Sequence, residues 1–205
     1  MKFEIIEDCS PYYIRYTHDF AEEIFQQCAD YKKQYIDTLS NKNKFMHIKL
    51  PIDLGSLILD KVYKAAELQL IKQRVSLFVT QSNHYYRPHR DGLAVKVGIN
   101  YHIDIKDDLC VTSWYDNKLF EGRPIDTLGG VSREIKDYNR EVEKSIIMPS
   151  KSMTAKQNEV VLFNTDYFHD VDNTASPNER TILTLRSSLY EKIDFFDARQ
   201  ILFNY

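Results

Sequence analysis

At 205 residues, with 43% hydrophobic and 28% charged side chains, the chain is long enough to bury a full core and too apolar to be intrinsically disordered. We therefore expect a single domain over residues 1–205. The formal charge of −3 provides no general attraction to nucleic acid or to anionic membranes, so we expect neither as a partner.

Cysteine usage and the first residues indicate the compartment. The cysteines are Cys9, Cys28 and Cys110, and their odd number and lack of C-x-x-C spacing argue against a disulfide framework or a zinc cluster. The N-terminus does not resemble a signal peptide, and no apolar stretch approaches the roughly 20 residues that span a bilayer. We expect a cytoplasmic protein, and the sequence leaves its oligomeric state open.

The first third of the chain has a helical pattern. Apolar residues recur at three- and four-residue steps at Phe20, Ile24, Cys28, Tyr31 and Tyr35, which predicts an amphipathic helix. A second helix is predicted over about 56–73. We therefore expect residues 1–73 to be mainly helical and to support one side of a set of strands.

From about residue 74 the hydrophobic period changes to two, which is typical of strands. In the most regular stretch, 95–105, apolar residues alternate with Lys96, Gly98, Asn100, His102 and Asp104. The polar face of this strand is either exposed to solvent or the interior of a small barrel. Further strands are predicted over 109–116, 145–149, 159–164 and 180–189. Together these strands predict an eight-stranded jelly roll over 74–190.

Residues 117–144 interrupt the strand pattern. They contain several glycines, a proline and many charges, with only scattered apolar residues. We expect a long loop with a short helix near 132–143. Loops of this length in compact domains are often functional lids, and the alternative is a segment without fixed structure.

The tripeptide His89-Arg90-Asp91 brings an imidazole and a carboxylate two residues apart. On an extended strand both side chains point the same way, so both can bind one ion. His169, which follows an apolar strand, is our third candidate ligand. Two imidazoles and one carboxylate hold Fe(II) on one octahedral face and leave positions open for oxygen and substrate. The alternative is that these residues lie in charged, solvated loops.

Two arginines could bind a carboxylate beside such an ion. Arg180 and Arg186 lie on one predicted strand at an even separation, and Thr184 shares their face. A guanidinium binds a carboxylate through two parallel hydrogen bonds, and the threonine could add a hydroxyl. We favour Arg180 as the clamp for a dicarboxylic co-substrate. Arg186 is left as an alternative clamp or a substrate contact, and for both the alternative is a surface ion pair.

Other residues near these candidates have simpler expected roles. Asp166 and Asp170 flank His169, and one of them could orient its ring through the second ring nitrogen. We expect His102 to be a structural histidine and Trp114 to pack in the core.

The order H-x-D, then a distant histidine, then an arginine resembles the Fe(II)/2-oxoglutarate-dependent oxygenase superfamily. Tyr85–Asp91 resembles the aromatic approach to the first ligand in that family. Glu159–Val171 resembles its turn, strand and short loop before the distal histidine, and Arg180–Thr184 its co-substrate strand. The resemblance covers about 74–190. It implies an α+β protein whose core is a double-stranded β-helix, also called a cupin-like jelly roll. Helices at the N-terminus would support this core.

The resemblance also implies an activity. The enzyme would bind Fe(II) through His89, Asp91 and His169 and use O2 to couple decarboxylation of 2-oxoglutarate to oxidation of a second molecule. Asn100 or Tyr101 would donate another hydrogen bond to the co-substrate, and the strand period lets only one of them face inward. Hydroxylation of a small molecule or a peptidyl residue is the expected reaction. The rival is a non-catalytic jelly-roll module that binds a metal or another ligand.

Overall fold

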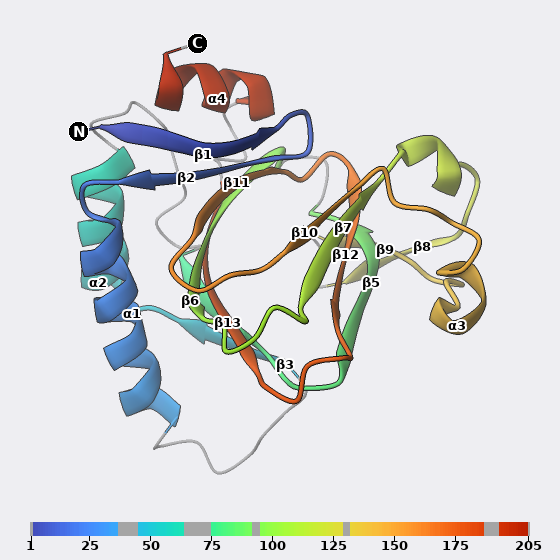
Figure 1. The fold of residues 1–205 in the computed structure, drawn as a ribbon, viewed down its shortest axis with the longest axis horizontal. Coiled ribbons are helices and arrows are strands. Elements are labelled where there is room, and N and C mark those ends of the chain that lie inside the picture. The colour runs from blue at the N-terminus through green and yellow to red at the C-terminus, as the bar shows by residue number, and fades with distance from the viewer. Residues whose placement is uncertain are drawn as a thin grey trace.

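Two antiparallel β-sheets face each other in the centre of the molecule, as Figure 1 shows. The computed structural model describes residues 2–36, 45–63, 75–91, 95–128, 132–186 and 193–204. The larger sheet has seven strands, in the order β1 (Phe3–Cys9), β2 (Tyr13–His18), β11 (Val160–Asn164), β6 (Val97–Asp104), β13 (Arg180–Arg186), β4 (Ser76–Thr80) and β3 (Phe45–Lys49). The smaller sheet has six, in the order β10 (Lys151–Thr154), β7 (Val111–Tyr115), β12 (Phe168–Asn173), β5 (His84–Arg90), β9 (Ser132–Ile135) and β8 (Ile125–Leu128). This is the predicted double-stranded β-helix, since the chain passes repeatedly between the two sheets from β4 to β13.

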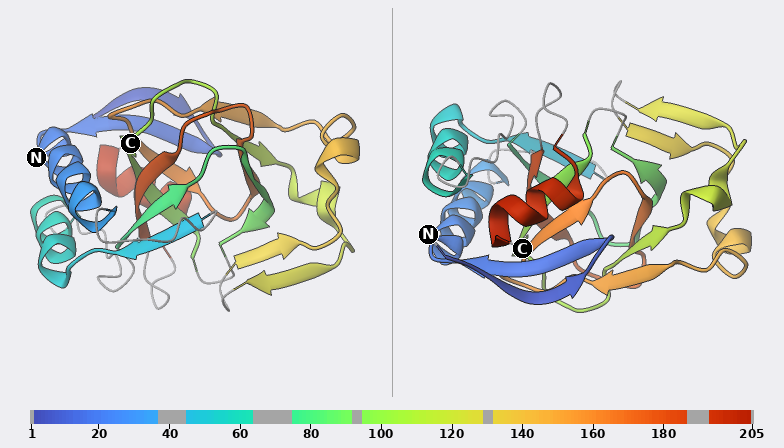
Figure 2. Two further views of the ribbon diagram at one scale, coloured as in Figure 1. Left: turned by 90° about the horizontal axis from the view of Figure 1, so that it is seen from below. Right: turned by 90° about the horizontal axis from the view of Figure 1, so that it is seen from above.

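Helices cover the outer face of the larger sheet. Helix α1 (Ala21–Ile36) packs on β6, and α4 (Phe195–Phe203) packs on β1 and β11. Helix α2 (Ile52–Ile58) continues as a short π-helix, η1 (Leu59–Tyr63). Both views in Figure 2 place α1 and α2 at one end of the molecule and the β8–β9 hairpin at the other. No helix among the described residues is both long and apolar enough to cross a membrane.

The expectation that residues 1–73 are mainly helical was incomplete. Strands β1, β2 and β3 also come from this part of the chain and extend the larger sheet. Along β1 the residues alternate between partly buried and exposed, as expected for a strand at a sheet edge. The helix predicted over 56–73 begins earlier, at Ile52, and residues 64–73 lie outside the described part of the chain.

The alternation of strand β6 decides which groups face the space between the sheets. Its apolar residues Val97, Ile99, Tyr101 and Ile103 join the core under the helices. Its polar face, which includes Asn100, faces the interior between the two sheets. For Asn100 the barrel interior is therefore the correct alternative, whereas Asp104 at the end of the strand pairs with Lys32 of α1 at 2.7 Å.

The strand predicted over 145–149 was wrong. The amides of Ile146 and Ile147 both donate to the Glu143 carbonyl, at 2.9 and 2.7 Å, and close a turn. Ile146 and Met148 are 70% and 71% exposed, so this apolar run is not a buried strand. Strand β10 begins later, at Lys151.

The segment 117–144 is more ordered than the predicted loop. It contains a 3-10 helix, η3 (Asn117–Phe120), the β8–β9 hairpin and helix α3 (Arg140–Glu143). Phe120, Ile135 and Tyr138 pack on the outer side of the smaller sheet, against Tyr115 and Phe168. None of the residues described in this segment lines the cavity between the sheets. Its role as a lid stays a prediction.

Two buried histidines make the fold sensitive to acid. The ring of His18 hydrogen-bonds to the Tyr101 hydroxyl at 2.7 Å, and burial lowers the pKa of His18 from 6.5 to about 4. Burial, and then the neighbouring Arg180, also holds the pKa of His102 well below its usual value. Both rings are therefore neutral in the folded chain. In the unfolded chain they take up protons near pH 6.5, so the unfolded state binds more protons at lower pH.

We therefore expect the free energy of unfolding to be fully developed above pH 6.5 and to fall as the pH drops toward 4. The shift of His18 alone corresponds to a loss on the order of 3 kcal/mol. Chemical denaturation at a series of pH values measures this. His18→Gln keeps a polar side chain but takes up no proton, so its stability should fall less steeply. An equal slope in both proteins would contradict this explanation.

Candidate metal centre

A cavity of about 370 Å³ lies between the two sheets. Apolar and aromatic side chains such as Trp114 and Phe163 form much of its wall. Polar groups from both sheets also reach it, and they include most of the residues that the sequence singled out: His89, Asp91, Asn100, His169, Arg180, Thr184 and Arg186.

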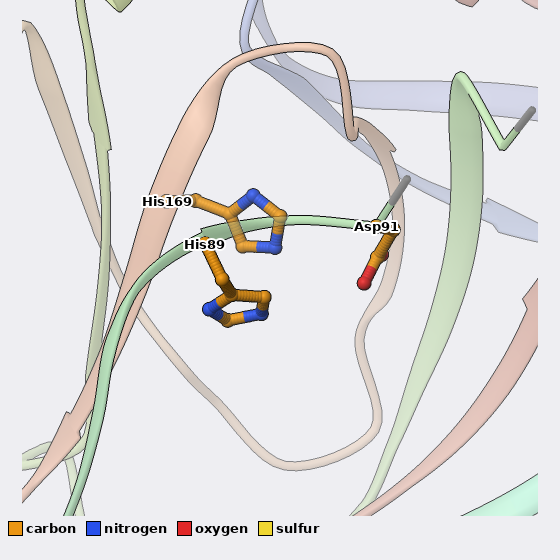
Figure 3. Close-up of side chains that lie close together, drawn as sticks. All are labelled: His89, Asp91 and His169. Atoms are coloured by element: carbon orange, nitrogen blue, oxygen red, sulfur yellow. The ribbon is translucent and has the colours of Figure 1, made fainter. Parts of the chain in front are cut away.

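Three of these residues converge on one point. His89 lies near the end of β5 and Asp91 directly follows that strand, while His169 lies on β12 as the cross-strand partner of His89. One ligand atom from each residue lies within 4.8 Å of those of the other two, and all three residues are at least nine-tenths buried. Figure 3 shows the two rings and the carboxylate grouped around a common space. The candidate ligands that are 78 residues apart in the sequence therefore meet, as the sequence predicted.

The hydrogen bonds of the two rings suit metal binding. The Nδ1 of His89 lies 2.8 Å from the Arg87 carbonyl, and that of His169 lies 3.0 Å from the Tyr167 carbonyl. A carbonyl can only accept, so each Nδ1 donates to it, and Nε2 is the ring nitrogen of each histidine that is left to bind a metal. Burial and the nearby His89 lower the pKa of His169 to about 3, which keeps its ring neutral. Two neutral imidazoles and a carboxylate fit a divalent transition metal such as Fe(II).

The possibility that Asp166 or Asp170 orients His169 was wrong, because Nδ1 of His169 bonds to the Tyr167 carbonyl. Asp170 points to the opposite side of β12, where it accepts hydrogen bonds from the hydroxyls of Tyr85 and Tyr115, both at 2.7 Å. Asp166 pairs with Arg90 at 3.2 Å. A backbone carbonyl, that of Tyr167, orients the His169 ring. The identities of the side chains alone could not predict this.

Arg180 is a buried cation in the cavity wall. It is 5% exposed, with Nη2 at 3.4 Å from Nε2 of His102 and Nη1 at 3.6 Å from the Cys110 sulfur. The Nδ1 of His102 lies 3.2 Å from the Lys156 carbonyl, so its Nε2 accepts from the guanidinium. No carboxylate among the described residues forms an ion pair with Arg180. A buried charge without a counter-ion is costly, so this site suits an anionic ligand.

The structure distinguishes Asn100 from Tyr101. Asn100 lies opposite Thr184 on the neighbouring strand and accepts a hydrogen bond from its hydroxyl, and both line the cavity. Tyr101 points into the core under the helices, where its hydroxyl bonds to His18 at 2.7 Å and to Tyr63 at 2.6 Å. A contact of Tyr101 with a co-substrate in the cavity is therefore ruled out, and Asn100 is the inward residue of the pair.

Arg186 reaches the metal cluster. Its Nη2 lies 3.0 Å from the Asp91 carboxylate, and its guanidinium lies 5.0 Å from the ring centre of Phe163. Both side chains cover Gly98, where a Cβ would lie 2.4 Å from the Arg186 guanidinium and from the Phe163 ring. Glycine at this position therefore makes room for the pair. Arg186 therefore does not form a surface ion pair. Its contact with Asp91 depends on how the strands pair, which the sequence alone does not show.

The position of Trp114 in the cavity wall is not predicted by the sequence motifs. Trp114 packs in a buried cluster, as expected, but it also lines the cavity as the direct cross-strand partner of His169. The period of two along β7, combined with the pairing of β7 and β12, is the signal that could have found it.

Comparisons with solved structures support the fold. HygX from Streptomyces hygroscopicus, solved with nickel and 2-oxoglutarate bound, matches with a TM-score of 0.59 and 8% identity over 85% of this chain and 81% of that chain. The epimerase SnoN, in complex with Fe3+, alpha ketoglutarate and nogalamycin RO, has a TM-score of 0.53 and 11% identity over 85% and 77%. A prolyl-4-hydroxylase from Pseudomonas putida has a TM-score of 0.51 and 12% identity over 88% and 94%. No protein-family model and no curated protein matches the sequence. At these identities the likeness is one of fold.

Proposed function

Because this chain has the fold of 2-oxoglutarate/Fe(II)-dependent oxygenases, we propose that it is itself such an enzyme, a dioxygenase that hydroxylates its substrate. The observation that carries the proposal is the buried cluster of His89, Asp91 and His169. Nδ1 of each histidine is held by a backbone carbonyl, which leaves Nε2 to face a metal, and the cluster lines the cavity into which ligands could bind.

The proposed reaction consumes 2-oxoglutarate, O2 and a substrate C–H bond and yields succinate, CO2 and the hydroxylated product. Bound Fe(II) supplies the oxygen chemistry, and the protein supplies binding, orientation and shielding. His89, Asp91 and His169 would hold the metal on one face and leave the other positions for the keto acid and oxygen. The apolar wall of the cavity would exclude bulk water from the reacting groups.

Arg180 would hold the far carboxylate of 2-oxoglutarate. Its buried guanidinium has no counter-ion among the described residues, and His102 fixes its orientation. Thr184 and Asn100 lie on the neighbouring wall and would bind the same co-substrate. Arg186, which pairs with Asp91, would act at the metal end of the cavity.

A small molecule or a single peptidyl side chain is the proposed substrate. A cavity of about 370 Å³ that also holds the keto acid leaves room for a compact group beside the metal. HygX has been solved with hygromycin B bound, so the binding of a small molecule has a precedent on this fold. The rival proposal is a non-catalytic binding module. The ion pair between Arg186 and Asp91 favours it, because that pair compensates the carboxylate without a metal.

Spectroscopy and product analysis test the proposal. Without oxygen, Fe(II) and 2-oxoglutarate together should give a weak visible charge-transfer band, and in air succinate should form. Zn(II) should give neither result, because it is redox-inactive. A protein that binds Fe(II) but gives no band and no succinate with excess 2-oxoglutarate would favour the non-catalytic module.

A further inference from the structure

We propose that Trp114, Tyr13 and Cys9 form an electron-transfer relay from the metal centre to the protein surface. The relay would discharge the strong one-electron oxidant that forms at the metal when the keto acid and oxygen react without a substrate. The formation of that oxidant depends on the proposed function being correct. The path itself rests on the contacts between β7, β2 and the end of β1.

The inner end of the relay is beside the candidate metal centre. Trp114 pairs directly with His169 across β7 and β12, so their Cβ atoms lie about 4.5–5.5 Å apart. Both residues line the cavity, and Trp114 is 1% exposed. It is also the single tryptophan of the chain. An easily oxidised indole therefore lies beside a metal ligand and out of contact with solvent.

The second member stacks on the first. The rings of Tyr13 and Trp114 are 5.1 Å apart between centroids, with an angle of 27° between their planes. Tyr13 is also 1% exposed. Offset stacking of two aromatic rings at this distance allows rapid electron transfer from the phenol to an oxidised indole.

The outer end provides a base for the phenolic proton. The Tyr13 hydroxyl donates to Oε1 of Glu7 at 3.2 Å, and the Cys9 thiol donates to the same oxygen at 3.3 Å. Burial raises the pKa of Tyr13, so its oxidation must release a proton as well as an electron. The side chain of Glu7 is 39% exposed, and Cys9 is partly exposed. Charge can therefore leave the buried cluster at this point.

Each step balances. Trp114 gives one electron to the oxidant, and Tyr13 then returns one electron to Trp114 and its phenolic proton to Glu7. Cys9 next reduces the Tyr13 radical: its electron goes to the phenoxyl oxygen, Glu7 returns the proton there, and the thiol proton passes to Glu7. A small external thiol then restores Cys9 by donating one hydrogen atom at the surface. Glu7 releases its extra proton to solvent, and one proton from solvent enters the cavity to balance the electron delivered there. After two such passes, the two thiyl radicals of the external thiol couple to a disulfide.

The first experiment uses metal-free protein and does not depend on any enzyme activity. Trp114 is photo-ionised at a wavelength absorbed by tryptophan alone, and transient absorption follows the radicals. The tryptophan radical should decay as a tyrosyl radical appears. In Tyr13→Phe the tryptophan radical should live at least about ten times longer. Tyr12→Phe is the matched control, because Tyr12 packs against the same cluster but its ring contacts Tyr167, with 5.0 Å between the centroids. Glu7→Gln should slow the transfer without changing either ring.

A tyrosyl radical that forms equally in Tyr13→Phe would overturn the relay. The rival donor is Tyr86, whose ring lies 5.1 Å from that of His89. Loss of the tyrosyl signal in Tyr86→Phe, with the signal kept in Tyr13→Phe, would assign the path to Tyr86 and also overturn the relay.

The second experiment tests the protective role with Fe(II), 2-oxoglutarate and air but no substrate. Peptide mass mapping should find Trp114 intact in the parent protein and oxidised in Tyr13→Phe, which should also inactivate several-fold sooner. Equal oxidation of Trp114 in both proteins would overturn the protective role. Absence of succinate from both would instead overturn the proposed function, and the photo-ionisation result would stand by itself.

Discussion

Replacing His89 with alanine is expected to lower the affinity for Fe(II) more than about 100-fold and to abolish succinate formation. His89 supplies one of the three converging ligand atoms, and two remaining ligands cannot hold the ion on one face. Changes to groups that merely orient a ligand already cost about 10–100-fold, so loss of the ligand itself should cost more. Calorimetric titration with Mn(II) measures the affinity, and succinate formation in air measures turnover.

His84→Ala is the matched control for this prediction, because it removes the same side chain from the other end of the same strand. It should bind Mn(II) like the parent protein. Asp91→Ala should repeat the loss seen with His89→Ala. Circular dichroism shows whether each variant is folded. If folded His89→Ala retained the parent affinity, the assignment of the metal centre would be wrong.

Replacing Arg180 with alanine is expected to raise the KM for 2-oxoglutarate roughly 100-fold while leaving the affinity for Mn(II) nearly unchanged. Arg180 touches His102 and Cys110 rather than the metal cluster. A hydrogen bond to a charged group contributes about 1.5–3 kcal/mol, and loss of a two-pronged contact corresponds to about 3 kcal/mol or more. Steady-state kinetics with varied 2-oxoglutarate measures the effect.

Three further arginine variants make this prediction specific. Arg180→Lys keeps the charge but loses the second hydrogen bond, so its KM should lie between those of the parent and Arg180→Ala. Arg186→Ala should change metal binding more than co-substrate binding, because Arg186 contacts Asp91. Arg199→Ala removes a surface ion pair with Asp8 and should behave like the parent. If Arg186→Ala raised the KM and Arg180→Ala did not, the clamp would be Arg186.

Local sequence patterns predicted the parts of the fold that depend on near neighbours. The period of two along β6 correctly placed Ile99 and Tyr101 under the helices and Asn100 toward the cavity, because side chains of a strand must alternate. Asp104 at the end of the strand departs from this pattern and pairs with Lys32 of α1. The apolar run at 145–149 misled the same reasoning. Its residues form an exposed turn after α3, and hydrophobicity by itself does not specify burial.

The strands within residues 1–18 and 117–144 were harder to predict, because hydrophobicity is also a weak guide to edge strands. β1 is an edge strand with one exposed face, and β8 is a short edge strand of the smaller sheet. Such strands have weak hydrophobic patterns, since only a few of their residues enter a core. Each pairs with the next strand of the chain, β1 with β2 and β8 with β9, and these hairpins join the sheets only through distant strands, β2 on β11 and β9 on β5.

The sequence by itself determined the chemical identity of the candidate site: an imidazole and a carboxylate two residues apart, a distant histidine and an arginine beyond it. Only the tertiary structure decided which neighbours they meet. It turned Asp170 away from the cavity, placed Arg186 on Asp91 and set Trp114 beside His169. The physical reason is that a motif needs only the geometry of one strand, whereas these contacts depend on the register between strands, where a shift of one residue turns every side chain to the other face.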